Sequence, residues 1–459
     1  MTSQQKSLFR TVRTRHPLDH RFTSIRLAEA AGPVRAELDD AYRNLEDPDG
    51  NFLEQFQTTG FDARFFELYL HAYFTRSGFT VNRRYDRPDF LVTRGGLEAA
   101  IEATTVNPSG LANQAPRGPF NELSYEERKL RVQNDLPIRF GGPLYSKLKM
   151  QYWNLPHCQG QPLVLAIEAF HADDALTFGD SAITGYVYGL RQTSAWTPDG
   201  DLIISTQHVA EHTRGTKTIP SGFFTSEGAE HISAVLFTNA GTYAKFARMS
   251  YLNGRSVDQF KISREGTSYT PVPLARDPSY FCYDLDVPPF LETWGHGLVV
   301  LHNPRALHPL PDEFFADAVQ THLKDGIPSE IIPDFHIISS KTNILYVPSG
   351  VRDLERLPTF TIFPISPEAF RSHVQYRGIG DNNPHVEDGW FADSSGGLLG
   401  VIAWDRSDED WLYVLLTREA DGTYSAADVV INLESRDDAR QGPYQSMATM
   451  LVGHAGNVR

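Results

Sequence analysis

The sequence predicts an α/β (α+β) protein, with a mixed sheet flanked by helices, β-rich additions and a small β-rich C-terminal domain. Three observations indicate this class. Residues 60–170 follow the order helix, strand, strand, strand, helix, strand. Residues 219–310 hold short apolar runs broken by Gly and Pro, and residues 389–433 alternate as strand-like runs. We expect three parts: a basic arm and helix over 1–57, a main domain with a β-rich extension over 58–345, and a β-rich module over 346–459.

The composition limits the function classes that we consider. The net charge of −15 argues against a protein that coats nucleic acid without sequence preference. Cys158 and Cys282 are the only cysteines, so no disulfide framework is expected and a reducing cytoplasm suits the chain. No apolar run is long enough to span a bilayer and no signal peptide is evident, so we expect a cytoplasmic protein without a membrane partner.

The first residues form a local exception to the acidic charge. Residues 1–26 carry six basic side chains against Asp19 alone. They can form a basic arm that contacts phosphates, or a solvated tail or strap over the domain, and the sequence leaves both readings open. The basic residues are Lys6, Arg10, Arg13, Arg15, Arg21 and Arg26.

A hairpin at residues 87–106 organises the main domain. Gly95-Gly96 separates two runs of strand composition, and a Gly pair is a strong signal for a two-residue turn because Gly enters positive φ at little cost. If Arg94 pairs with Leu97, then Phe90 faces Ile101, Val92 faces Ala99, and Asp89 faces Glu102. Directly opposed residues have Cβ atoms roughly 4.5–5.5 Å apart.

Two opposed carboxylates destabilise a sheet unless something neutralises them. A hard divalent cation does so, because carboxylate oxygens are the ligands that Mg²⁺ prefers. The hairpin therefore predicts a cation site at Asp89 and Glu102. The alternative is two solvated carboxylates on an exposed strand pair.

A helix is predicted upstream of the hairpin, over residues 60–79. Asp62 is its expected N-cap and Gly78 its expected stop. Glu67 lies within the apolar stripe, where an unpaired carboxylate is costly. Its partner is either the Asp89/Glu102 corner or a neighbour on the helix, Arg64 or His71. The stripe consists of Ala63, Phe66, Leu70, Tyr73 and Phe74.

The remaining elements of the core follow in order. Residues 80–85 are the expected first strand, 144–153 the second helix, and 161–170 a buried strand. Residues 107–142 are rich in Gly and Pro and form an insertion with one short helix over 125–131. A loop of this length beside a site is often a lid or a substrate contact, or it packs without a role in the chemistry.

This order of elements resembles the PD-(D/E)XK nuclease superfamily over roughly residues 61–171, with Glu67 on the first helix, Pro88-Asp89 opening the second strand and Glu102 on the third. The resemblance implies a restriction-endonuclease-like fold and a metal-dependent nuclease, a hydrolase acting on nucleic acid, with DNA favoured as the partner. It implies that Asp89, Glu102 and the carbonyl of Ala103 hold Mg²⁺ or Mn²⁺, with Glu67 adding or orienting a ligand. A bacterial defence or mobile-element setting rests on this resemblance alone.

The sequence departs from the superfamily pattern at its lysine. Thr104 stands two residues after Glu102, and a hydroxyl supplies no positive charge. In some members the lysine has moved to the following helix, so Lys147 is the expected replacement and Lys149 the second choice, with Gln151 orienting water. The alternative is a catalytically inactive relative that binds nucleic acid or another partner.

A second motif predicts a different chemistry. His208, Glu211 and His212 match the His-x-x-Glu-His pattern of inverted zincins. On a helix the two imidazoles would share a face and bind Zn²⁺, with Glu211 as base. A zinc peptidase is therefore an alternative function, with Glu292 as a conceivable third ligand. Surface histidines without a metal are the simpler interpretation.

The pattern of the remaining residues indicates strands, and it points to no particular reaction. Residues 231–237 and 297–302 are expected to extend the sheet of the main domain, and several phrases there resemble bacterial proteins of unassigned function. The C-terminal module has four expected strands and a helix over 436–450. Its expected role is binding or dimerisation, so a homodimer stays open. The four strands cover 390–392, 398–404, 411–417 and 424–433.

Overall fold

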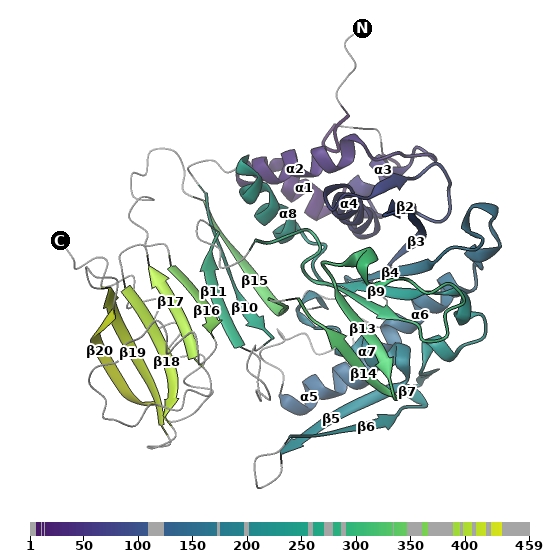
Figure 1. The fold of residues 1–459 in the computed structure, drawn as a ribbon. Helices are drawn as coiled ribbons and strands as arrows, with labels where there is room; N and C mark the ends of the chain where they lie inside the picture. The colour runs from purple at the N-terminus through teal and green to yellow at the C-terminus, as the bar shows by residue number, and fades with distance from the viewer. Residues whose placement is uncertain are drawn as a thin grey trace. The chain divides into compact units, whose positions relative to one another are not determined.

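The computed structural model describes residues 6–10, 12, 14–108, 124–171, 175–196, 202–255, 260–269, 279–285, 291–333, 335–346, 360–365, 389–394, 398–405, 410–418 and 424–433. The chain divides into two compact units. Unit 1 comprises Met1–Ser250 and Glu292–Pro333, and unit 2 comprises Tyr251–Leu291 and Asp334–Arg459. Each unit is built around one eight-stranded sheet (Figure 1).

Unit 1 begins with helices that surround a central helix, α4. Residues 65–74 of α4 are all buried, because α2 and α3 pack on one side of it and β3 on the other. The predicted helix is confirmed, and Gly78 follows its end with a φ of 81°. Asp62 is not the N-cap: Gly60 occupies that position, and Asp62 pairs with Arg21 instead. The bounds are α1 His20–Leu27, α2 Gly32–Arg43, α3 Phe52–Gln57 and α4 Phe61–Arg76.

The sheet of unit 1 is mixed, which confirms the predicted α/β class. Its strand order is β1-β2-β3-β4-β9-β12-β13-β14. The first three strands are antiparallel, whereas β4 lies parallel to both β3 and β9. The bounds are β1 Thr80–Asn82, β2 Phe90–Arg94, β3 Leu97–Val106, β4 Leu163–Ala169, β9 Ala234–Thr238, β12 Leu298–His302, β13 Val319–Lys324 and β14 Ile327–Ile331.

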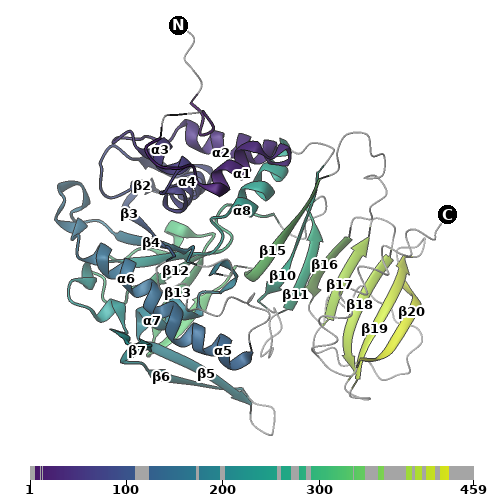
Figure 2. The ribbon, with the colours of Figure 1, turned by 180° about the vertical axis from the view of Figure 1, so that it is seen from behind.

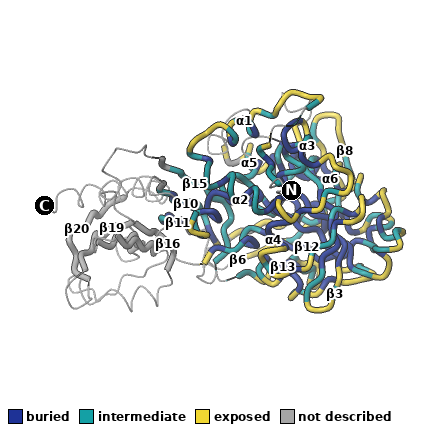
Figure 3. The backbone as a smooth tube through the Cα atoms, turned by 90° about the horizontal axis from the view of Figure 1, so that it is seen from above, coloured by how far each residue is buried: buried dark blue, intermediate teal, exposed yellow. Residues whose placement is uncertain are grey.

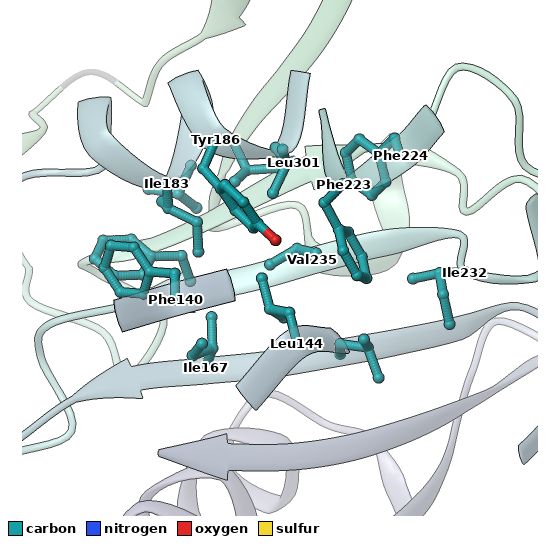
Figure 4. Close-up of a cluster of buried hydrophobic side chains, with 14 of the residues drawn as sticks. Phe140, Leu144, Ile167, Ile183, Tyr186, Phe223, Phe224, Ile232, Val235 and Leu301 are labelled. Carbon is teal, nitrogen blue, oxygen red and sulfur yellow. The ribbon is translucent and has the colours of Figure 1, made fainter. Parts of the chain in front are cut away.

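Helices cover both faces of this sheet. The group of α1–α4 with α8 (Tyr243–Ser250) lies on one side, and α6 (Leu136–Leu148) and α7 (Ser181–Tyr188) lie on the other (Figures 1 and 2). Apolar side chains from α6, α7, β4, β9 and β12 fill the second interface (Figure 4). In Figure 3 the buried residues gather in the interior of unit 1 and the exposed ones lie at its periphery.

The helix α6 begins earlier and ends earlier than the sequence predicts. It starts at Leu136, after α5 (Tyr125–Leu130) and a π-helical turn, inside the segment that was expected to be an insertion. Position 141 of α6 has no room for a side chain. A Cβ atom there would stand 2.5 Å from Ile219 and 2.9 Å from the Tyr186 hydroxyl, which explains why the residue is Gly141. Close packing against α7 and β8 (Lys217–Pro220) therefore outweighs the low helix propensity of Gly.

Residues 208–212 do not form the helix that the zinc-peptidase alternative requires. His208 ends strand β6 (Leu202–His208), which pairs with β5 (Leu190–Trp196), and Glu211 opens strand β7 (Glu211–Arg214), which pairs with β8. His208 and His212 therefore lie on two different strands, so their spacing of four residues does not bring the two imidazoles together on one helix face. The basis for a zinc peptidase at these residues is therefore lost.

Unit 2 contains an antiparallel sheet of order β15-β10-β11-β16-β17-β18-β19-β20. The four predicted C-terminal strands are confirmed, whereas the helix expected over 436–450 lies outside the described residues. The bounds are β10 Phe260–Ser268, β11 Ser279–Asp284, β15 Ile337–Tyr346, β16 Phe360–Ile365, β17 Gly389–Ser394, β18 Leu398–Asp405, β19 Asp410–Arg418 and β20 Tyr424–Leu433.

The units do not follow the predicted boundaries at 57/58 and 345/346. Residues 1–57 pack into unit 1, because α2 and α3 contact α4. β10, β11 and β15 belong to the sheet of unit 2, although they were expected to extend the main domain. β10 pairs with β11 and β15, and β11 pairs in turn with β16 beyond residue 345, where Cys282 lies opposite Ile362. No local signal in the sequence indicates that last pairing. Among the described residues, no helix is long and apolar enough to cross a membrane.

A buried carboxyl on β4 gives unit 1 an expected pH dependence. Glu168 is fully buried; its Oε1 accepts a hydrogen bond from the Gly241 N–H at 2.8 Å, and its Oε2 has no partner among the described residues. Burial raises the pKa of Glu168 well above its ordinary value, with a smaller contribution from the charge of Asp62. In the folded state Glu168 therefore keeps a proton that it releases in the unfolded chain once the pH exceeds the ordinary glutamate pKa of about 4.3.

We expect the stability of the wild type to fall, relative to Glu168→Gln, as the pH rises above about 4.5. The slope of the difference is at most about 1.4 kcal/mol per pH unit, the value for one proton. Urea unfolding of both proteins between pH 4.5 and 8 measures this slope. Subtracting the free energy of unfolding of Glu168→Gln from that of the wild type removes the contributions of the other titrating groups, which the two proteins share. Stability curves that stay parallel across this range contradict a protonated Glu168.

Candidate active site

The hairpin of β2 and β3 has the register that the Gly pair predicts. Phe90 pairs with Ile101, Val92 with Ala99, and Arg94 with Leu97. Gly95 and Gly96 adopt φ values of 59° and 83°, and a two-residue type I′ hairpin turn requires positive φ at both of these positions. The side chains of Asp89 and Glu102 consequently lie on the face that α6 covers, together with the core residues Leu91 and Ala100.

Asp89 and Glu102 form an interlocked corner just before β2 begins. The Asp89 N–H donates to Glu102 Oε2 at 3.2 Å, and the Ala103 N–H donates to Asp89 Oδ2 at 2.8 Å. Among the described residues, none donates to Asp89 Oδ1. Glu102 is buried and Asp89 is half-buried. One carboxylate oxygen of the corner thus has no donor among the residues that the structure describes.

The corner has the electrostatics expected of two neighbouring acids. The pKa of Asp89 is raised to about 6, first by burial and then by the charge of Glu102, while Lys147 acts in the opposite direction. A group in this state gives up its proton readily when a cation comes near.

Lys147 reaches the corner from α6. Its ammonium pairs with Glu102 Oε1, 45 residues away in the sequence, and its side chain remains 26% exposed. The predicted approach of Lys147 to Glu102 is therefore present. Thr104, two residues beyond Glu102, is half-buried and brings no charge to this face.

Tyr152 is a member of the site that sequence reasoning missed. Its hydroxyl donates to Glu102 Oε1 at 2.8 Å and the residue is buried. Burial and the charge of Glu102 raise the pKa of Tyr152, so the phenol stays protonated and keeps donating. The position depends on α6 ending at Leu148 and on Gln151 adopting a φ of 51°, and neither feature has a signal in the sequence.

Glu67 is held by arginines beside the corner rather than in it. Arg64 Nη1 donates to both its carboxylate oxygens, at 2.7 and 2.9 Å, and Arg83 Nη2 donates to Oε2 at 2.7 Å. Burial raises the pKa of Glu67, and the charge of Asp89 adds to that rise, so the two acids lie within electrostatic range. Of the two helix neighbours expected to pair with Glu67, Arg64 does so. The pairing of Glu67 with Arg83 is not predicted by the sequence.

Two further candidates lie away from the corner. Lys149 is exposed, with its ammonium 4.5 Å from the ring centre of Tyr145, and Gln151 is exposed and accepts a hydrogen bond from Asn154. Neither makes a contact with Asp89 or Glu102 among the described residues.

The histidines of the second motif are also separated. His208 and Glu211 are exposed. His212 is buried, with its ring nitrogens 2.8 Å from the Gln133 carbonyl and 2.8 Å from Ser221 Oγ. Glu292 is buried between Lys245 and Arg248 and is not available as their third ligand.

A cavity of about 460 Å³ is lined by residues from the end of β3, from α6 and from the hairpin of β7 and β8. Three cations line it: Arg139 from α6, and Arg214 and Lys217 from the hairpin of β7 and β8. Asp135 pairs with both arginines. Val106, at the cavity wall, is four residues after Glu102 on β3, so the cavity begins about 13 Å from the corner at ~3.3 Å per residue.

Comparisons of the chain with protein-family models, with curated proteins and with solved structures found no match.

Proposed function

We propose that this protein is a metal-dependent nuclease that hydrolyses phosphodiester bonds of nucleic acid, with DNA as the favoured substrate. The observation that carries the proposal is the pairing of Lys147 with Glu102 at the corner where Asp89 stands. Two acids and a lysine from separate elements meet on one sheet face, in the order helix, three strands, helix, strand. This order is also the support for a restriction-endonuclease-like core, which is part of the proposal.

The donor set fits a hard divalent cation such as Mg²⁺ or Mn²⁺. Asp89 and Glu102 offer carboxylate oxygens, and Asp89 Oδ1 accepts from no described residue. The Ala103 N–H points to Asp89, and a residue in a strand directs its N–H and C=O toward the same edge. The Ala103 carbonyl therefore lies on the Asp89 side, where it can serve as a third oxygen ligand.

Each residue then has a defined part in hydrolysis. Asp89 and Glu102 would hold the divalent ion, which when bound would polarise a phosphate and lower the pKa of a water molecule. Lys147 offsets the negative charge that develops on the phosphoryl oxygens. Tyr152 fixes the orientation of Glu102 through its hydrogen bond, and Glu67 with its arginines supports the helix beside Asp89. The basic cavity lined by Arg139, Arg214 and Lys217 is a suitable place for a phosphate farther along the same nucleic-acid strand.

The test is a nicking assay on supercoiled DNA with Mg²⁺ or Mn²⁺. We expect cleavage by the wild type, none with EDTA, and background levels for Asp89→Ala and Glu102→Ala. Glu98→Ala is the matched control, because Glu98 lies on the same strand and face as Glu102 but is exposed at the other end. Unchanged cleavage in both corner variants refutes the proposal.

A second function is favoured by one observation, the Thr104 that stands where the superfamily has lysine. In that case the protein binds nucleic acid or another partner without cutting it. Retarded migration of DNA by wild type and Asp89→Ala alike, with no cleavage at any divalent ion concentration, distinguishes this function from the first.

A further inference from the structure

A second cluster of metal-ligand side chains lies on strands β12 and β13. These strands are parallel neighbours with Leu301 opposite Thr321, so the next residues, His302 and His322, stand side by side. Their rings stack with centroids 4.2 Å apart and planes 8° from parallel. Asp312 begins the turn Asp312–Phe315 and approaches both rings.

The ligand atoms of this cluster lie close to one another. His322 Nε2 lies 2.9 Å from Asp312 Oδ1, and His302 Nε2 lies 3.6 Å from the same oxygen. One ligand atom from each of the three side chains lies within 4.8 Å of the others. Two ligands on a tetrahedral ion with bonds of ~2.0–2.1 Å are about 3.3 Å apart, so the spacing already suits a small cation.

Gln320 places a fourth donor beside His302. Its amide nitrogen donates to the carbonyls of Phe315 at 2.7 Å and Ala318 at 3.2 Å. This commitment turns its Oε1 toward His302 Nε2, at 2.8 Å. Gln320 is buried, so the amide orientation is held by packing as well as by hydrogen bonds. Supporting contacts of this kind are typical of metal sites whose ligands are fixed in advance.

The three side chains differ in their exposure to solvent, and Asp312 is the most exposed of them. The side chain of His302 is 8% exposed, that of His322 is 29% exposed and that of Asp312 is 43% exposed. An ion can therefore enter past Asp312 and come to rest against His302.

We propose that His302, His322 and Asp312, with the Gln320 carbonyl oxygen as fourth donor, form a zinc site. Two imidazoles select Zn²⁺ over Mg²⁺, which prefers oxygen ligands alone. The site lies on the sheet face opposite the core residue Leu301, whereas Asp89 and Glu102 share the face of that core. It is thus separate from the proposed nuclease site. It ties β12, β13 and the turn at Asp312 together.

The experiment is equilibrium dialysis of the full chain against Zn²⁺, with metal analysis of the protein. We expect one Zn²⁺ per chain, a thermal midpoint that rises with Zn²⁺ concentration, and a visible Co²⁺ spectrum typical of tetrahedral coordination. His322→Ala and Asp312→Asn should each weaken Zn²⁺ binding about 100-fold, at least as much as the loss of a supporting contact. Asp312 is half-exposed, so Asp312→Asn leaves the fold intact, which circular dichroism checks.

His208→Ala is the matched control, because His208 is an exposed strand-end histidine outside the cluster. It should retain the Zn²⁺, as should Asp89→Ala, which separates this site from the nuclease corner. The proposal is overturned if the wild type binds no Zn²⁺, if His322→Ala and Asp312→Asn bind it as the wild type does, or if His208→Ala loses it.

Discussion

Lys147→Met is expected to lower the rate of DNA cleavage by a factor of roughly 10²–10³, the usual cost of removing one group that stabilises charge in a transition state. Lys147 is the one described cation paired with Glu102. Methionine keeps the length of the side chain and its packing on α6 but not the charge. Single-turnover cleavage at saturating Mg²⁺, with DNA binding measured separately, gives the rate.

A pH profile distinguishes a catalytic effect of Lys147 from a structural one. Lys147 lowers the pKa of Asp89, which stands at about 6 in its presence. Without that charge the Asp89 pKa rises, so the acid side of the rate profile should move to higher pH. Lys149→Met is the control, since Lys149 lies at the end of the same helix, exposed and away from Glu102. An unchanged rate and profile in Lys147→Met removes this lysine from the mechanism.

Glu292→Gln is expected to destabilise unit 1 by about 3–5 kcal/mol, the range for breaking a buried ion pair from one side. Lys245 Nζ donates to Glu292 Oε1 at 2.8 Å, and Arg248 donates through Nε and Nη2 at 2.9 Å each. All three side chains are less than 5% exposed. Glutamine has the same shape but leaves two buried cations facing a neutral amide.

Chemical unfolding followed by tryptophan fluorescence measures this loss. Glu313→Gln is the control, because Glu313 is exposed on the same returning segment and should change stability by no more than about 0.5 kcal/mol. Lys245→Met/Glu292→Met/Arg248→Met should recover much of the loss, since apolar groups of similar size replace a buried network with little cost. A Glu292→Gln variant as stable as Glu313→Gln shows that the triad does not hold the fold.

The features that sequence could predict are those fixed by neighbours along the chain. The Gly95-Gly96 turn sets the register of β2 and β3, so the approach of Asp89 to Glu102 follows from counting residues. The end of α4 is marked locally too, at Gly78.

The features that it could not predict depend on distant packing. Tyr152 reaches Glu102 only because α6 stops at Leu148 and the chain turns back. The stacking of His302 on His322 requires two parallel strands to meet, and their sequences say nothing about their neighbours. The spacing of His208, Glu211 and His212 carries no information on secondary structure, which the pairing of β7 with β8 decides.

The place where the chain leaves unit 1 also lies close to the place where it returns. Lys245 and Arg248 lie on α8, which ends at Ser250, the last residue before the chain enters unit 2. Both pair with Glu292, the first residue after the chain returns to unit 1. Because departure and return are clamped together, the segment between them is topologically an insert. That segment supplies β10 and β11, which pair with β15 and β16 from the C-terminal part of the chain. The sheet of unit 2 is therefore assembled from two stretches that are separated in sequence by the return of the chain to unit 1, and it is complete only when both stretches are present.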